Sequence, residues 1–207
     1  AMSFLGWKAY AVARLNADVA SVRVKEDMRR WGVDLDYAEC APTCSTPILI
    51  QKIERNTRGE PIHRFAWNCP HCGTWLPGYK AVRAKAAEEI SRTLTPPRVF
   101  FMDRLSRGAL VLAKAFAARN ALIVFEPSSR AEPRLFREAL QTVHILKYAE
   151  TRLQNVTVET ANSAVLLEVQ TLGPRGLRYR FRPDARSRFQ SWRSLAAMNT
   201  GIVRDTC

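Results

Sequence analysis

The sequence predicts an α/β protein built on a mostly parallel sheet. In the second half of the chain, short and almost continuously apolar runs alternate with amphipathic segments, as in parallel sheets covered on both faces. With 47% hydrophobic and 25% charged residues, and only 9 Gly and 11 Pro among 207, the composition excludes a disordered or fibrous chain. No run approaches 18 uninterrupted apolar residues, so we expect no membrane-spanning segment.

The first expected element is a helix over residues 17–31. Apolar residues recur at steps of three and four from Ala17 to Trp31, and Gly32 follows where a helix commonly ends. From Val33 to about Tyr79 the chain changes to short β-prone runs separated by Pro and Gly. This stretch predicts a small antiparallel sheet with loops.

The regular alternation begins after residue 80. We expect helices near 82–93, 107–119, 133–141 and 148–154, and buried strands at 98–102, 121–125, 143–146 and 165–170. His144 lies within one of these apolar runs, which favours a core position over a catalytic one. A turn over 171–176 leads into a last strand over 177–182, in which apolar residues alternate with arginine.

The charge and the cysteines restrict the environment and the partners. Lys and Arg exceed Asp and Glu by 32 to 19, a net charge of +13, which favours anionic partners such as nucleotides, nucleic acid or sugar phosphates. Five cysteines are an odd number in a chain large enough to fold without disulfides. We therefore expect a reducing, cytoplasmic compartment.

Four of these cysteines lie in the predicted β region and have metal-ligand spacing. Cys69 and Cys72 are separated by two residues and followed by Gly73, the pattern of a zinc knuckle, while Cys40 and Cys44 are separated by three. Together the four predict one structural zinc site, with His63 as a competing ligand. Ordinary unligated thiols are the alternative.

Two other functions of these motifs are weighed and not favoured. A thioredoxin-like dithiol at Cys69 and Cys72 requires a following helix, whereas the residues from Gly73 to Gly78 do not open one. Seven arginines between Arg175 and Arg193, with aromatic residues among them, could bind single-stranded nucleic acid. Because the alternation is first explained by a strand with a core face and a solvated arginine face, we do not expect nucleic-acid binding.

Seven short segments, in this order along the chain, resemble those of the ribokinase-like (PfkB) carbohydrate kinase family. They are residues 11–18, 27–34, 45–47, 124–130, 145–147, 171–176 and 205–206. The resemblance implies a three-layer α/β/α sandwich in one domain over residues 1–207, with residues 33–79 as a β lid.

The resemblance also implies an activity. Members transfer the γ-phosphoryl group of ATP, with Mg²⁺, to a hydroxyl of a sugar or nucleoside, a reaction that depends mainly on positioning and charge stabilisation. It places Lys147, Thr171, Gly173 and Gly176 near the nucleotide. The family's Asn-x-x-Glu motif falls on Ala149 and Arg152, so Glu150 lacks the expected metal-organising context. Glu126 stands where the family often has Asp before Pro.

The resemblance stops short at both ends of the sequence. The family's catalytic Gly-Ala-Gly-Asp motif would begin directly after Cys207, and its N-terminal acceptor-binding strand would precede Leu5. We therefore expect an incomplete ribokinase-like domain without phosphotransfer activity, whose bare apolar surface favours a homo-oligomer. The alternative function is that of a catalytically dead kinase-like binding or oligomerisation protein with a zinc-tied lid.

Overall fold

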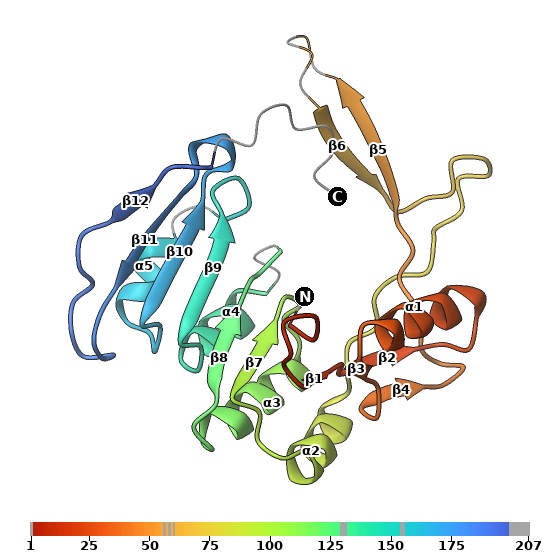
Figure 1. Cartoon of the computed structure of the whole chain (residues 1–207), viewed down its shortest axis with the longest axis horizontal. Coiled ribbons are helices and arrows are strands. Elements are labelled where there is room, and N and C mark those ends of the chain that lie inside the picture. Colours follow the sequence, from red (N-terminus) through yellow and green to blue (C-terminus); the bar gives the residue numbers. More distant parts are fainter. Residues whose placement is uncertain are drawn as a thin grey trace. The chain divides into compact units, whose positions relative to one another are not determined.

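A computed structural model describes residues 2–55, 57, 59, 61–128, 132–153 and 156–198, except for the side chains of 61, 63 and 156–158. The chain divides into two compact units, residues 1–82 and 83–207 (Figure 1). Among the described residues, no helix combines the length and apolar character needed to cross a bilayer.

The first unit contains two short parallel strand pairs. Strand β1 (Ala9–Tyr10) pairs with β3 (Val33–Asp34), and β2 (Ala13–Leu15) pairs with β4 (Ala38–Cys40). Helix α1 (Val19–Arg30) connects β2 to β3, because parallel strands need a crossover. It confirms the predicted helix.

Local polar contacts fix the position of α1. The Asp18 side chain accepts a hydrogen bond from the Ser21 backbone N–H at 2.7 Å, which caps the first turn. Gly32 follows the helix with a φ of +69°, a conformation that other residues adopt at a cost.

The region from Val33 to Tyr79 only partly matches the antiparallel sheet expected of it. Strands β5 (Ile50–Arg55) and β6 (Pro61–Ala66) form an antiparallel hairpin, in which Ile50 pairs with Ala66. The strands before it, β3 and β4, instead pair in parallel with the N-terminal strands. This pairing leaves no signal in the sequence, because two- and three-residue strands have too little periodicity to detect.

The second unit is organised around a six-stranded sheet in the order β12-β11-β10-β9-β8-β7. Its strands are β7 (Val99–Met102), β8 (Leu122–Phe125), β9 (Ile145–Ala149), β10 (Leu167–Thr171), β11 (Leu177–Phe181) and β12 (Arg193–Leu195). Strands β7 to β10 are parallel, whereas β11 and β12 are antiparallel to their neighbours. The predicted mostly parallel α/β architecture is confirmed.

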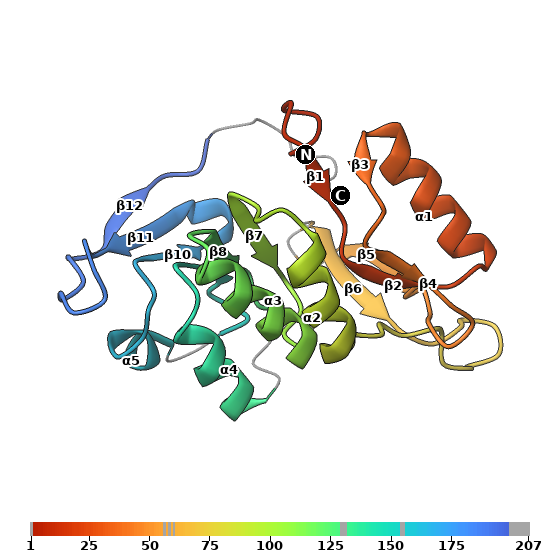
Figure 2. The same ribbon diagram turned by 90° about the horizontal axis from the view of Figure 1, so that it is seen from below.

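In the described part of this unit, four α-helices accompany the sheet. They are α2 (Ala84–Thr93), α3 (Arg107–Ala117), α4 (Pro133–Leu140) and α5 (Val156–Ala161). Helices α3, α4 and α5 lie on one side of the sheet, and α2 packs against α3 (Figure 2). The helix predicted over 148–154 is wrong, because β9 continues to Ala149 and α5 begins at Val156.

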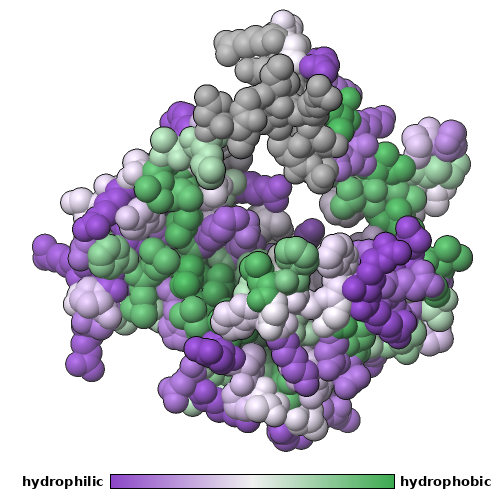
Figure 3. All heavy atoms as spheres, viewed as in Figure 1, coloured by the Kyte–Doolittle hydropathy of each residue, from purple (hydrophilic) through white to green (hydrophobic). Residues whose placement is uncertain are grey.

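The two faces of the sheet differ strongly in burial. On the helix-covered face, Ile123, Phe125 and Leu146 are fully buried. On the other face, Phe101 is 55% exposed and Leu122 is 39% exposed. Apolar side chains are visible over the strands of this sheet in the space-filling view (Figure 3). The described part of the second unit therefore has two of the three layers of the expected sandwich.

The arginine face of β11 is not solvated, which corrects the prediction for this strand. Arg182 is 4% exposed and donates hydrogen bonds to backbone carbonyls, including that of Val165 at 2.7 Å. The guanidinium carbon of Arg180 lies 4.4 Å from the ring centre of Phe189 and 4.9 Å from that of Trp192. The arginine side chains of this strand thus interact with groups of the chain itself instead of with solvent.

A pair of neighbouring residues on β8 tests the difference between the two faces. Ile123→Ala removes a fully buried side chain and should lower the free energy of unfolding by about 2–5 kcal/mol. Leu122→Ala, on the open face, should cost less than about 1 kcal/mol. Chemical denaturation of both variants measures this difference, and equal losses would contradict an open sheet face.

Candidate functional site

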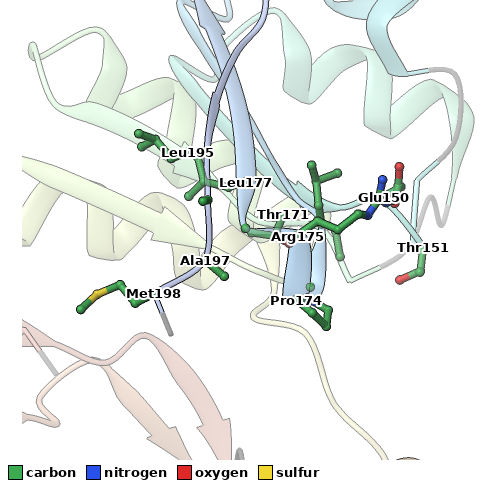
Figure 4. Close-up of a pocket in the computed structure, with 14 residues that line it drawn as sticks. Glu150, Thr151, Thr171, Pro174, Arg175, Leu177, Leu195, Ala197 and Met198 are labelled. Carbon is green, nitrogen blue, oxygen red and sulfur yellow. Dashed lines mark hydrogen bonds and ion pairs between the residues drawn. The ribbon is translucent and has the colours of Figure 1, made fainter. Parts of the chain in front are cut away.

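A pocket lies at the carboxyl ends of two parallel strands of the second unit. It has a volume of about 810 Å³. It is lined by residues 149–151 at the end of β9, residues 171–177 from the end of β10 to the start of β11, and residues 195–198 at the end of β12 (Figure 4). In open α/β sheets, ligands commonly bind at the carboxyl ends of the strands.

The turn after β10 lines this pocket, and its backbone conformation requires glycine at two positions. Gly173 has a φ of +60°, and a Cβ built on it would meet no atom within 4 Å. Gly176 has a φ of +91°, and a Cβ there would lie 2.5 Å from the Ala197 backbone nitrogen and closer still to the Leu195 carbonyl oxygen. Gly176 is thus required by the chain's own packing, whereas Gly173 leaves open space.

Two predicted nucleotide residues, Thr171 and Lys147, differ in their relation to the pocket. Thr171 lines the pocket. Lys147 is not among the lining residues and lies in the middle of β9 rather than at its end. Its ammonium group forms an ion pair with Glu126, which follows the neighbouring strand β8. The two half-exposed side chains neutralise each other beside the open face of the sheet.

An ion pair between Glu150 and Arg175 spans one side of the pocket, as Figure 4 shows. It joins the end of β9 to the turn after β10. Sequence reasoning considered Glu150 as a metal ligand and missed Arg175 as its partner, since no sequence spacing indicates a contact across 25 residues. Arg175 is the basic residue among those that line the pocket.

The pocket does not fit the Mg²⁺ role that the resemblance implies. Ala149 and Arg152 stand at the positions of the family's Asn-x-x-Glu motif, and the carboxylate of Glu150 is already paired with Arg175. Within the described residues, no group of three or more His, Cys, Asp or Glu side chains is arranged to hold a metal ion.

Cys69 and Cys72 lie at the tip of a short hairpin in the first unit. The Cys69 N–H donates to the Thr74 carbonyl at 2.8 Å, and the Gly73 N–H donates to the Cys69 carbonyl at 2.9 Å. Gly73 has a φ of +73°. Residues 73–83 open no helix, in agreement with the argument against a thioredoxin-like dithiol.

The electrostatic surroundings favour a thiolate at Cys72. The hydroxyl and backbone N–H of Thr74, followed by hydrogen bonding with Cys69, lower the pKa of the Cys72 thiol. Cys72 Sγ lies 3.2 Å from the Thr74 hydroxyl oxygen. A thiolate is the form of cysteine that binds metals.

The other two cysteines have different environments. Cys44 is 4% exposed, while Cys40 Sγ lies 3.1 Å from the Lys25 ammonium and 3.3 Å from the Asn16 carbonyl oxygen. The structure does not bring these two together with Cys69 and Cys72 into a group of metal ligands. The single-chain, four-cysteine zinc site stays a prediction.

His144 has a structural contact that explains its place. Its Nδ1 accepts a hydrogen bond from the Ile123 N–H at 3.0 Å, and partial burial lowers the pKa of its imidazole. It precedes β9 instead of lying inside a strand. The Asp205-Thr206 segment, Cys207 and the side chain of His63 lie outside the described residues.

Comparison of the structure with solved structures identifies the fold. Ribokinase from Giardia lamblia superposes with a TM-score of 0.68 at 14% identity, over 95% of this chain and 61% of that one. Nucleoside kinase from Methanocaldococcus jannaschii has a TM-score of 0.64 at 12% identity, over 99% and 64%. The chain has the ribokinase-like fold. No protein-family model and no curated protein matches the sequence.

The ribokinase-like fold is shared over nearly all of this chain but over only part of the solved structures. Fructokinase with bound ATP from Xylella fastidiosa has a TM-score of 0.62 at 14% identity, over 87% of this chain and 60% of that one. This chain therefore spans between 60% and 64% of the length of these three kinases.

The two glycines of the pocket turn provide a matched test. Gly176→Ala forces a side chain against the backbone of residues 195–197 and should lower the free energy of unfolding by roughly 2–4 kcal/mol. Gly173→Ala introduces only backbone strain and should cost about 1–2 kcal/mol. Thermal denaturation distinguishes them, and a Gly176 variant as stable as the Gly173 variant would contradict the close packing.

Proposed function

We propose that the pocket beside the turn after β10 binds the phosphate groups of ATP, as part of a ribokinase-like sugar or nucleoside kinase. The observation that carries this proposal is the position of the pocket, at the carboxyl edge of two parallel strands and directly against residues 171–176. Those residues are the ones that the sequence resemblance assigned to the nucleotide.

The chemistry of the lining supports an anionic ligand. Open space around Gly173 allows a ligand to approach the backbone closely. Arg175 presents five N–H donors in a planar arrangement that suits phosphate oxygens, and its side chain is 67% exposed. The chain's net charge of +13 attracts anions over a longer range.

ATP would supply the γ-phosphoryl group for transfer to an acceptor hydroxyl. Thr171, Gly173 and Arg175 are the residues that we expect to hold it. Because the pocket residues do not fit the implied Mg²⁺ site, we assign no step to a metal ion bound by this chain. The Xylella fructokinase has a structure with bound ATP, and we extend nucleotide binding to this chain as part of the proposal.

The structural neighbours indicate the class of phosphoryl acceptor. Solved structures with this fold include a ribokinase, a fructokinase and a nucleoside kinase, so the acceptor class is a sugar or nucleoside with a free hydroxyl.

Two substitutions that break the same ion pair test nucleotide binding with opposite expected signs. Arg175→Gln removes the cation that faces the pocket and should weaken ATP binding by roughly threefold to tenfold. Glu150→Gln releases Arg175 and removes a negative charge, so it should strengthen binding by a similar factor. Isothermal titration calorimetry measures both affinities.

Comparing the two variants distinguishes an effect of charge on ATP binding from an effect of losing the ion pair. If the two variants change the affinity in the same direction, loss of the ion pair alone explains the effect, and Arg175 does not contact the phosphates. Absence of ATP binding by the unaltered chain would contradict the proposed function itself.

A non-catalytic binding role is the second candidate, and the Glu150–Arg175 pair favours it. This pair occupies the remaining carboxylate near the family's metal-organising positions. In that role the chain binds a nucleotide without transferring its phosphoryl group.

The two candidates differ in turnover. We predict that the 207-residue chain forms no ADP above background when it is incubated with ATP, Mg²⁺ and a panel of sugars and nucleosides, because the carboxylate of Glu150 is paired with Arg175 and Ala149 and Arg152 stand at the metal-organising positions. A coupled assay for ADP measures this. Acceptor-dependent ADP formation that purification does not separate from the chain would refute the non-catalytic role.

A further inference from the structure

The turn that contains Cys69 and Cys72 presents two free thiols with the spacing of metal ligands. It closes the hairpin formed by residues 67–76, in which the Leu76 N–H donates to the Trp67 carbonyl at 2.8 Å and Asn68 forms a β-bridge with Trp75. The Asn68 side-chain amide also donates to the Gly73 carbonyl at 3.1 Å. These bonds hold the turn in place before any metal binds.

The two sulfurs of this turn are positioned to act together. Cys69 and Cys72 lie in one turn, in which the Gly73 N–H donates to the Cys69 carbonyl, and neither forms a disulfide. Cys72 is exposed and Cys69 is partly exposed, so a metal ion can reach both. Two thiolates separated by two residues, with a glycine after the second, grip one face of a zinc ion.

Structural zinc needs four ligands, and the described part of the chain supplies only two at this turn. Cys40 is held at the end of β4, paired in register with Leu15, and Cys44 is almost completely buried. Cys40 is exposed, but its sulfur contacts the Lys25 ammonium and the Asn16 carbonyl oxygen. A four-ligand site at this turn therefore needs two ligands beyond those that the described residues of one chain bring together.

The surroundings of the turn indicate a protein surface as the source of those ligands. Trp75 is 74% exposed, Phe65 is 51% exposed and Trp67 is 38% exposed, all on this hairpin or the strand that leads into it. Exposed aromatic residues are typical of the buried centre of an interface. A second copy of this chain brings both the same aromatic surface and an identical pair of thiolates, as a twofold interface requires.

We propose that Cys69 and Cys72 of two copies of this chain bind one zinc ion between them, in a site of four cysteine sulfurs that joins the copies into a dimer. The site lies in the first unit, and the inference is independent of nucleotide binding in the second. Binding converts the thiols to thiolates and releases their protons to solvent.

The test uses the purified chain, kept reduced and stripped of metal with a chelator, and then titrated with Zn²⁺. We expect one zinc for every two chains and a doubling of the mass in sedimentation velocity, reversed by the chelator. Cys69→Ser combined with Cys72→Ser should abolish both effects. Cys40→Ser combined with Cys44→Ser should leave both unchanged, and His71→Ala, within the same turn, should also leave both unchanged.

Cobalt replacement keeps the proposal testable if a cysteine variant fails to fold. Co²⁺ bound to the unaltered chain should show the strong thiolate-to-cobalt absorption of four sulfur ligands at half a cobalt per chain. One metal per chain, lost in both double variants, would replace the proposal with a four-cysteine site inside one chain. Absence of metal binding, or a dimer that forms without zinc and disappears with reductant, would also overturn it.

Discussion

The carboxylate of Glu168 is the constraint on which the pocket-forming half of the molecule depends. It is fully buried on the helix-covered face of β10, where an isolated charge would be costly. Tyr148 on β9 donates to it at 2.6 Å, Thr160 on α5 at 2.9 Å and Arg180 on β11 at 2.6 Å. Burial and this contact raise the pKa of the Tyr148 hydroxyl, which keeps it a donor. The Glu168 carboxylate thus links β10 to β9, β11 and α5 through hydrogen bonds.

The hairpin of β10 and β11 contributes both to the buried core of this unit and to the lining of the pocket. Its buried face is held by the contacts of Glu168 and by the stacking of arginines on Phe189 and Trp192. Its turn, at the far end, holds Gly173 and Arg175 against the pocket. The chain segment that supplies the stacked rings continues into β12, whose end passes over Gly176 and completes the lining. The residues that stabilise the fold and those proposed to bind phosphate are thus neighbours in sequence but lie on different parts of the hairpin.

Sequence patterns predicted the long elements of the fold and missed those that depend on distant contacts. Helices α1, α3 and α4 have clear periodicity and capping residues, and the apolar runs of β7 and β8 are short but nearly continuous. The extension of β9 through Tyr148 to Ala149 was missed because these residues were assigned to a helix over 148–154, although Tyr148 favours a strand. The turn after β10 was found from its glycines, whereas the Glu150–Arg175 pair was not, because only the parallel pairing of β9 and β10 brings them together.

Binding of nucleotide phosphates at the carboxyl edge of β9 and β10 is the central claim. A crystal structure of the chain with a non-hydrolysable ATP analogue tests it most directly. We predict that the phosphates lie beside Gly173 and within hydrogen-bonding distance of the Arg175 guanidinium, with the Glu150 contact loosened. Electron density for the analogue at another surface, or a pocket without density at a saturating concentration of analogue, would contradict it.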